Sequence, residues 1–130
     1  MTSRKPILCL DFDGVIHSYD HGWQDGTIYG TVVSGFFDWL KVAQEHFTIV
    51  IYSSRSKTPE GIAEMKKWLT AQNELYLAGS DKVDIFDGTA IAFASEKPPA
   101  FLTIDDRALQ FNGNWYDDAW WPEKLLAFKP

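Results

Sequence analysis

The sequence predicts an α/β fold with a largely parallel sheet, and two observations support this. Short apolar or β-rich runs at 7–10, 47–52 and 101–104 alternate with segments of helical spacing. Each of these runs is followed directly by polar residues. In parallel α/β sheets, ligands bind beyond the carboxyl ends of the strands. The chain has 130 residues, and we expect a single domain covering 1–130.

The first elements are expected to be a strand, a flap and a helix. Residues 7–10 form a continuous apolar run, which is typical of a strand buried on both faces. The segment of about 15–33 is rich in glycine and polar residues, which favours a short β-hairpin flap over a helix. Ser34 is expected to cap a helix that runs to about Glu45. The strand-like pieces of the flap lie at 27–29 and 31–33.

The later elements follow the same alternation. Thr58 followed by Pro59 predicts a helix start, because proline is favoured at the first helical position. The expected elements are a strand at 47–52, a helix from Pro59 to about Gln72, short strands at 75–77, 83–86 and 90–93, a buried strand at 101–104 and a short helix at 123–127.

Composition limits the function classes. The formal net charge is −6, so the chain has no general attraction to nucleic acid or anionic lipid. The single cysteine, Cys9, lies in an apolar run and is expected to be a buried thiol. No run approaches the roughly 18 apolar residues that a membrane span needs. We expect a soluble, cytoplasmic protein with no membrane partner.

Four carboxylates follow two of the predicted strands. Asp11 and Asp13 follow the first strand, and Asp105 and Asp106 follow the strand at 101–104. Gathered at one edge of the sheet, they would repel one another unless a cation neutralised them. Oxygen ligands of this kind favour Mg²⁺, with Asp11, Asp13, Asp105 and Asp106 as its candidate ligands. The histidines lack the spacing of a zinc site; they are His17, His21 and His46.

The same edge carries groups that suit phosphoryl transfer. A carboxylate can attack phosphorus, and a second carboxyl two residues on can act as general acid and base. Hydroxyls and amides at Ser53 and Ser54 could hold phosphate oxygens. Lys97 is the preferred lysine to neutralise the phosphate, with Lys82 as the competitor.

These residues, taken in order, resemble the motifs of the haloacid dehalogenase superfamily of phosphohydrolases. The stretch Asp-Phe-Asp-Gly-Val at 11–15 resembles its first motif, Ser53 the second, Lys97 the third and the Asp-Asp pair at 105–106 the fourth. The resemblance implies that Asp11 is the nucleophile and Asp13 the general acid and base. It implies that Ser53 and Lys97 bind the phosphoryl group. The implied Mg²⁺ ligands are Asp11, the backbone carbonyl of Asp13, Asp105, and Asp106 directly or through water.

The resemblance also implies an architecture, a Rossmann-like three-layer αβα sandwich. Neither insertion is long enough for a full cap domain, so the flap is the only lid expected. Capless members of the family often act on large substrates or close the site by forming oligomers. Residues 53–55 and 104–108 are also similar to phage-type hydrolases and to the phosphatase domain of polynucleotide kinase–phosphatases.

The expected function is Mg²⁺-dependent hydrolysis of a phosphomonoester through an aspartyl-phosphate on Asp11. One alternative is a phosphatase specific for nucleotides or for a polynucleotide terminus, and another is a non-catalytic module that binds phosphate or Mg²⁺. The expected partner is a phosphorylated small molecule or nucleic-acid end, and a homo-oligomer is left open.

Several residues keep two interpretations. Ser53 is preferred to Ser54 for phosphate, and Arg55 either binds phosphate or pairs with an acidic neighbour. For the flap, aromatic packing is preferred to contact with the leaving group. Arg107 is expected to form a structural ion pair. For Trp115, Trp120 and Trp121, core closure or a dimer surface is preferred to base stacking. For Asp84 and Asp87, a turn is preferred to a metal site.

Overall fold

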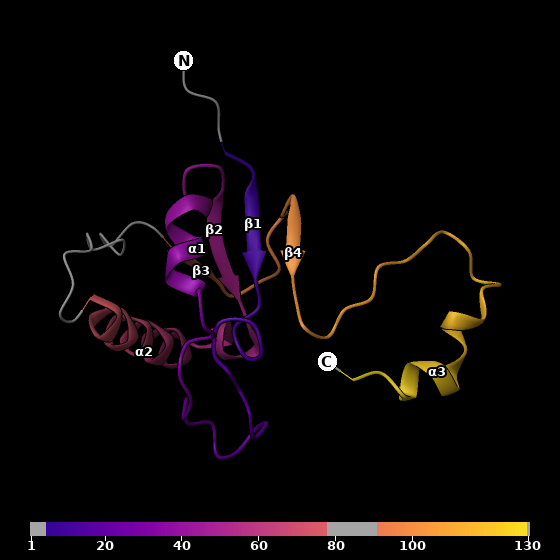
Figure 1. The fold of residues 1–130 in the computed structure, drawn as a ribbon, viewed down its shortest axis with the longest axis horizontal. Coiled ribbons are helices and arrows are strands. Elements are labelled where there is room, and N and C mark those ends of the chain that lie inside the picture. The colour runs from indigo at the N-terminus through magenta and orange to yellow at the C-terminus, as the bar shows by residue number, and fades with distance from the viewer. Residues whose placement is uncertain (1–4, 78–90, 130) are drawn as a thin grey trace.

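A computed structural model describes residues 5–77 and 91–129 of the chain. In these residues the strands form one four-stranded sheet, in the order β3-β2-β1-β4, and all neighbouring strands are parallel (Figure 1). The α/β class and the parallel sheet are therefore confirmed. The elements are β1 (Ile7–Leu10), α1 (Phe36–Ala43), β2 (Thr48–Tyr52), the 3₁₀ helix η1 (Ser54–Lys57), α2 (Pro59–Leu77), β3 (Ile91–Ala94), β4 (Leu102–Ile104), the 3₁₀ helix η2 (Asp118–Trp120) and α3 (Pro122–Leu126).

The hydrophobic core lies on one face of the sheet. Leu8 and Leu10 of β1 pair in register with Ile49 and Ile51 of β2, so these four side chains point to the same face. All four belong to one buried cluster, which also contains side chains from α1 and α2. Both helices therefore cover this face. The helical members of the cluster are Phe36, Phe37, Leu40, Ala43, Met65 and Leu69.

The opposite face of the sheet lacks the helical layer that the sequence predicted. Cys9 and Val50 point to it, since they alternate with the core residues of β1 and β2. In the described residues, the connection from β3 to β4 is the irregular segment 95–101 rather than a helix. Lys97 of this segment lies near enough to Cys9 to act on its thiol, so the segment crosses beside that face. Two layers, rather than three, are thus present in 5–77 and 91–129.

The two main helices begin in different ways. Gly35 is the N-cap of α1 with φ of 89°, a left-handed conformation that glycine adopts without strain, and no side chain caps this helix. The prediction that Ser34 caps it is wrong. Thr58 does cap α2, because its Oγ1 accepts a hydrogen bond from the Gly61 amide at 3.0 Å.

Helix α2 is longer than its sequence indicated. The predicted strand at 75–77 is wrong, because these residues form the last turn of α2. Asn73 and Tyr76 continue the helical spacing of the buried Leu69, and the Tyr76 ring packs on Phe37 with 5.2 Å between centroids. The predicted strand at 83–86 lies outside the described residues, as do Lys82, Asp84 and Asp87.

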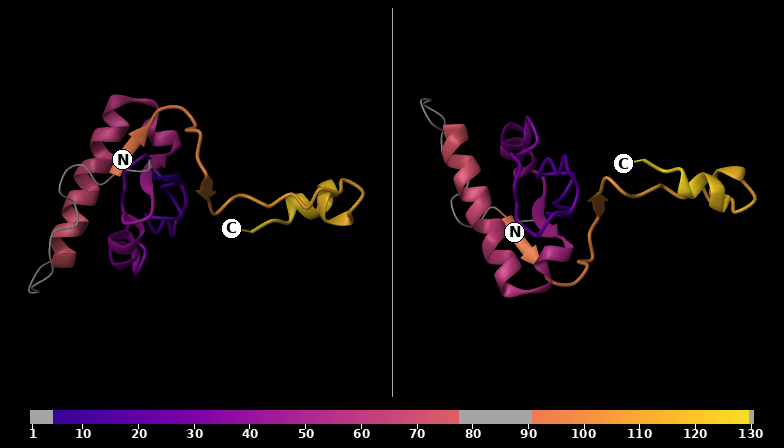
Figure 2. Two further views of the ribbon diagram at one scale, coloured as in Figure 1. Left: turned by 90° about the horizontal axis from the view of Figure 1, so that it is seen from above. Right: turned by 90° about the horizontal axis from the view of Figure 1, so that it is seen from below.

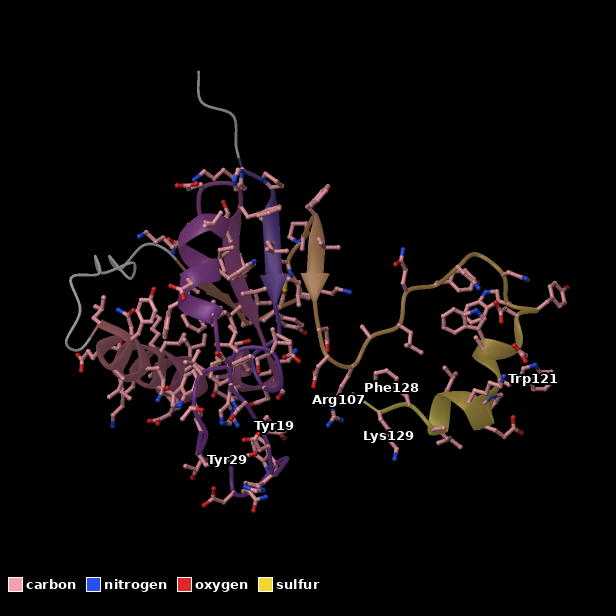
Figure 3. All side chains as sticks on the ribbon, in the orientation of Figure 1. Tyr19, Tyr29, Arg107, Trp121, Phe128 and Lys129 are labelled. Atoms are coloured by element: carbon pink, nitrogen blue, oxygen red, sulfur yellow. The ribbon has the colours of Figure 1, made fainter. Side chains whose placement is uncertain are left out.

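The flap at 15–33 contains no β-strand, so the predicted hairpin is wrong as a regular element. One antiparallel bridge joins His17 to Val32, and the Val33 amide donates to the Ile16 carbonyl at 2.7 Å. Aromatic packing fixes the rest, as expected. Tyr19 and Tyr29 lie beside each other (Figure 3), and the His17 ring lies 5.0 Å from that of Tyr29.

The strand β4 is exposed, in contrast to the buried strand that the sequence predicted. Leu102 and Ile104 are 55% and 40% exposed. In the described sheet β4 is an edge strand whose one partner is β1, and the chain after it leads away from the sheet in all views (Figures 1 and 2). The short helix predicted at 123–127 is α3, one residue earlier. In the described part of the chain, the structure contains no helix that could cross a membrane.

Candidate metal and phosphate site

Three of the four predicted carboxylates come together at the carboxyl ends of β1 and β4. Asp11, Asp105 and Asp106 each offer a carboxylate oxygen, and these oxygens all lie within 4.8 Å of one another. β1 and β4 are adjacent parallel strands, which brings the residues that follow them to the same edge of the sheet. The Asp11 amide donates to the Ile104 carbonyl at 3.0 Å, so the pairing of the strands continues to the cluster itself.

Asp11 has a pKa well above its ordinary value. Burial is the main cause, and the negative charges of Asp105 and Asp106 add to it, so that the pKa of Asp11 rises to about 6. The Phe12 amide donates to Asp11 Oδ1 at 2.8 Å, which opposes the rise without cancelling it. The negative form of Asp11 is therefore disfavoured where it lies, and a positive charge beside it would lower its pKa.

Asp106 supplies a buried oxygen that has no partner. Its Oδ1 is inaccessible to solvent and has no hydrogen-bond partner among residues 5–77 and 91–129. The Asp106 carboxylate also lies against the backbone of Gly14, where a Cβ would come within 2.2 Å of Oδ2. Only glycine leaves space for the carboxylate at this position, and Gly14 has φ of +86° besides. An unpaired buried carboxylate oxygen is costly, so this oxygen calls for a cation or a donor.

The side chain of Asp13 lies outside this cluster, in contrast to Asp11, and is held by Arg55 and His17. Arg55 Nε donates to Asp13 Oδ2 at 2.8 Å, and Arg55 Nη2 donates to Asp13 Oδ1 at 3.1 Å. His17 Nδ1 lies 2.9 Å from Asp13 Oδ1. Of the two interpretations of Arg55, the structure therefore has the guanidinium paired with an acidic neighbour.

His17 contacts Asp13, and the sequence analysis did not predict this contact. Its side chain is fully buried, and its Nε2 accepts a hydrogen bond from the Gly30 amide at 2.9 Å. Because Nε2 is an acceptor, the proton of the ring must be on Nδ1, which donates it to Asp13. The sequence signal for this contact is the spacing of four residues between Asp13 and His17. That spacing brings the two side chains together only because the chain turns tightly at Gly14, where the Gly14 amide donates to the His17 carbonyl at 2.8 Å.

Ser53 and Ser54 lie at the carboxyl end of β2 and differ in role. Ser53 is buried, and its Oγ accepts a hydrogen bond from the Arg55 amide at 3.2 Å, which caps η1. Ser56 completes this turn, since its Oγ accepts from the Ser53 amide at 3.0 Å. Ser54 is exposed. The sequence analysis missed Ser56, because the usual capping box has Glu or Gln rather than serine three residues after the cap.

Lys97 and Arg107, two basic residues, lie on either side of β4 in the sequence, and both side chains are exposed. Lys97 is exposed, and it lies in the connection between β3 and β4, near Cys9. Burial raises the pKa of the Cys9 thiol, while the charge of Lys97 acts in the opposite direction. Arg107 is exposed, and no ion pair of its side chain is found among residues 5–77 and 91–129; its amide donates to Asp105 Oδ1 at 2.8 Å. That bond orders the loop of the cluster.

Comparisons with known proteins leave the site to be interpreted by its chemistry. The chain matches no family model, no curated protein and no solved structure. The likeness to the haloacid dehalogenase superfamily consequently depends on the four short motifs and on their order.

Proposed function

We propose that the protein is a Mg²⁺-dependent phosphomonoester hydrolase with Asp11 as its nucleophile. The observation that carries the proposal is the group of Asp11, Asp105 and Asp106, whose oxygens lie within 4.8 Å of one another at the carboxyl ends of β1 and β4. A carboxylate with a raised pKa next to two others suits a site completed by a divalent cation and a phosphate.

The residues present fit Mg²⁺. All three offer carboxylate oxygens, which this hard cation prefers, and Asp106 Oδ1 is buried without a partner. The space above Gly14 is filled by the Asp106 carboxylate rather than by a Cβ. Asp11, Asp105 and Asp106 would hold the ion. When bound, it would neutralise the negative charge that the carboxylates share with the phosphate of the substrate.

The proposed chemistry has two steps. A carboxylate oxygen of Asp11 attacks phosphorus, the bond from phosphorus to the leaving oxygen breaks, and that oxygen takes a proton from the Asp13 carboxyl. Water then attacks the aspartyl-phosphate and gives a proton to Asp13. The bond between phosphorus and the Asp11 oxygen breaks, which releases phosphate and regenerates the Asp11 carboxylate, while Asp13 again carries the proton it started with.

The proposal requires Asp13 to change partners. In the structure both oxygens of Asp13 accept hydrogen bonds from Arg55. A phosphate is a better match for a guanidinium than one carboxylate, because it offers more oxygens and more charge. We infer that bound substrate draws Arg55 toward the phosphate and so releases Asp13 to act as acid and base. Lys97 and Ser53 are the further groups assigned to the phosphate, with Ser54 as the alternative to Ser53. The Ser53 hydroxyl accepts from the Arg55 amide and can still donate its own proton to a phosphate oxygen.

The test is phosphate release from 4-nitrophenyl phosphate, from a sugar phosphate, from a nucleotide and from 3′- and 5′-phosphorylated oligonucleotides, with Mg²⁺ and with EDTA. We expect release that needs Mg²⁺ and that is lost in Asp11→Asn, while the control Asp20→Asn, at an exposed carboxylate of the flap, keeps full activity. The preferred substrate decides between a small-molecule and a polynucleotide phosphatase. Release that survives in Asp11→Asn would exclude Asp11 as the nucleophile.

A second candidate function is a module that binds phosphate or Mg²⁺ without turnover. The engagement of Asp13 by Arg55 and His17 favours it, because a general acid and base must be accessible to the substrate. Isothermal titration with Mg²⁺ and inorganic phosphate separates the two. Binding without release from any of the substrates above would select the module.

A further inference from the structure

The chain after the sheet contains no buried residue. From Phe101 to Lys129 every side chain is exposed or half-exposed, including Trp115 at 74% and Leu126 at 87%. The hydrogen bonds found for residues 111–128 join them to one another, as between Lys124 Nζ and Asp118 at 2.9 Å. We call residues 108–129 the C-terminal segment. It lies apart from the rest of the chain in perpendicular views (Figures 1 and 2).

The apolar side chains of the C-terminal segment form a surface of their own. Phe111, Trp115 and Trp120 pack together with centroids 4.5 to 6.0 Å apart, yet Trp115 remains largely exposed. Since each aromatic side chain can bury about 150–250 Å², this segment exposes on the order of 1,000 Å² of apolar surface. So much exposed apolar area is unusual for a monomer and marks a binding surface. The other exposed apolar residues of the segment are Leu109, Tyr116, Trp121, Leu125, Leu126 and Phe128.

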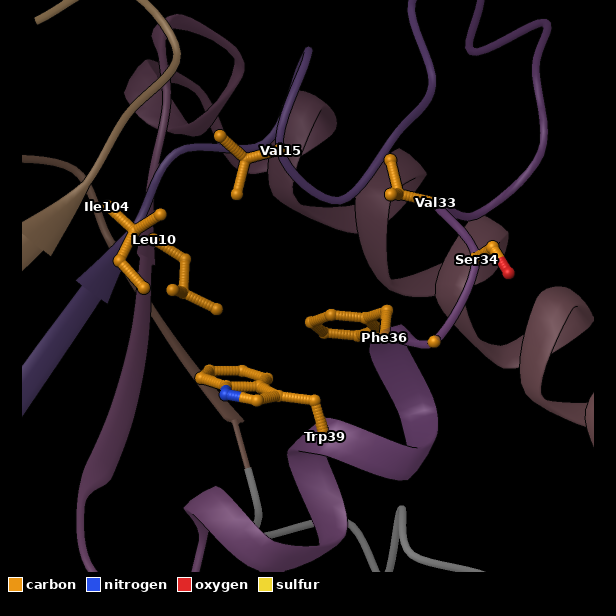
Figure 4. Close-up of a pocket in the computed structure, with 8 residues that line it drawn as sticks. Leu10, Val15, Val33, Ser34, Phe36, Trp39 and Ile104 are labelled. Atoms are coloured by element: carbon orange, nitrogen blue, oxygen red, sulfur yellow. The ribbon is translucent and has the colours of Figure 1, made fainter.

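The body of the protein has a complementary apolar groove. A cavity of about 250 Å³ opens between β1, β4, the flap and the start of α1, and we call it the groove (Figure 4). Its volume is smaller than the ~300–1,000 Å³ of small-molecule pockets, so one or two side chains suit it better than a ligand. The residues whose apolar side chains line it are Leu10, Val15, Val33, Phe36, Trp39 and Ile104.

The groove is continuous with other uncovered surface of the sheet. Leu102 and Ile104 point to the same face as Leu8 and Leu10, with which they pair, but α1 and α2 leave them exposed. The outer edge of β4 also has no neighbouring strand in the described sheet. An apolar face beside an open edge is a surface that folded proteins normally cover.

We propose that the C-terminal segment of a second copy of the chain covers the groove, and that two copies exchange these segments reciprocally. The segment follows Ile104, a residue of the groove, after the short loop that carries Asp105 and Asp106, and it leads away from the sheet. The groove would take one or two of these side chains, and the exposed face of β4 beside it would receive others. Two segments carry roughly 2,000 Å² of exposed apolar surface in total, which is enough to supply the ~1,200–2,000 Å² that stable interfaces bury. Exchange of identical elements gives a closed twofold dimer. The proposal is independent of the proposed phosphatase activity.

The exchange is tested by the mass of the full chain in solution, measured by sedimentation velocity. We expect a dimer of twice 14.8 kDa. Trp39→Glu in the groove and Leu126→Glu in the segment should each give monomers. Val42→Glu is the matched control for Trp39, because Val42 is an exposed residue of α1 that does not line the groove. Circular dichroism checks that each variant is folded.

Mixing the variants separates exchange from other arrangements. In a mixture of Trp39→Glu with Leu126→Glu, the intact segment of the first chain can occupy the intact groove of the second, so dimers should return. A native chain that stays monomeric would overturn the proposal, because no second copy would then cover the groove. A dimer unaffected by both substitutions would also overturn it, as would two monomeric variants that fail to form dimers when mixed.

Discussion

Arg55 and Asp13 form a two-pronged ion pair, with Nε 2.8 Å from Oδ2 and Nη2 3.1 Å from Oδ1. The same guanidinium donates to the Gly26 carbonyl at 2.6 Å and lies 5.1 Å from the centre of the Trp23 ring. Arg55 thus connects the carboxyl end of β2 to the loop that follows β1 and to Gly26 and Trp23 of the flap. A change in what the guanidinium binds would therefore affect both Asp13 and the flap.

We expect Arg55→Lys to reduce both activity and stability. An ammonium group cannot make two parallel bonds to one carboxylate while it also reaches Gly26. The loss of a charged hydrogen bond predicts a decrease of about 1.5–3 kcal/mol in the free energy of unfolding. Mispositioning of Asp13 predicts a fall of roughly 100-fold in phosphate release. Urea unfolding and initial rates measure the two effects.

The control for Arg55 is Lys57→Ala. Lys57 lies on the same turn, but it is exposed and donates only to the Tyr52 hydroxyl in the described residues, at 3.1 Å. This variant should differ from the native protein by less than about 0.5 kcal/mol. If Arg55→Lys kept native rates, the coupling of Arg55 to Asp13 would have no part in turnover.

The stability of the protein without metal should depend on the charge of Asp11. Its folded pKa, about 6, lies above the ordinary value of 3.8, so the folded state binds the proton more tightly than the unfolded chain does. Ionised Asp11 therefore lowers stability above about pH 6, and the effect disappears as the pH falls to about 4. Because Asp11 is partly exposed, we discount the shift to about 1–2 kcal/mol.

Asp11→Asn removes this charge. In EDTA at pH 8 the variant should have a higher free energy of unfolding than the native protein, and at pH 4 the two should be equal. Urea unfolding at the two pH values measures the difference, with Asp20→Asn as the control at an exposed position. A variant that is less stable than the native protein at pH 8 would contradict the assigned environment of Asp11.

The space over Gly14 can be tested separately from its backbone conformation. In Gly14→Ala the new Cβ would come within 2.2 Å of Asp106 Oδ2, so the carboxylate would have to leave the cluster. We expect the rise in melting temperature on addition of Mg²⁺ to disappear. Gly113→Ala is the control, because Gly113 has the same φ of +86° and no atom within 4 Å of a Cβ. Both variants carry the strain of the left-handed backbone, but only Gly14→Ala should lose the response to Mg²⁺.

The sheet and the acidic cluster were predictable from the sequence because they depend on local patterns. The apolar runs at β1 and β2 end at polar residues, and parallel pairing then places Asp11 beside Asp105 and Asp106 whatever the side-chain details. The capping of α2 by Thr58 was predictable for the same reason, since the signal lies within four residues.

The features that the sequence did not predict depend on tertiary contacts. The flap was expected to form a hairpin from its β-like composition, but its geometry is set by the buried His17 ring. The last turn of α2 was read as a strand, because Tyr76 finds its place only against Phe37. The ion pair of Arg55 with Asp13 joins residues that are 42 positions apart in the sequence. Local sequence patterns do not predict a contact over that separation.

The tautomer of the His17 ring decides whether His17 adds charge beside Asp13. Nε2 accepts from the Gly30 amide and Nδ1 faces Asp13, so we expect a neutral ring with its proton on Nδ1. Long-range ¹H–¹⁵N spectra of the native protein near pH 7 should show a protonated Nδ1 and an unprotonated Nε2. The exposed His46 gives a solvent-exposed reference in the same spectrum.

With that tautomer, His17 orients Asp13 without adding charge, and Arg55 alone balances the Asp13 carboxylate. His17→Gln would then lower the free energy of unfolding through loss of packing with Tyr29 and Trp68, while Arg55 still holds Asp13. If the spectra show both ring nitrogens protonated, the Gly30 amide cannot donate to Nε2. His17 would then be a second cation beside Asp13, and the removal of Arg55 alone would not free that carboxylate for acid and base chemistry.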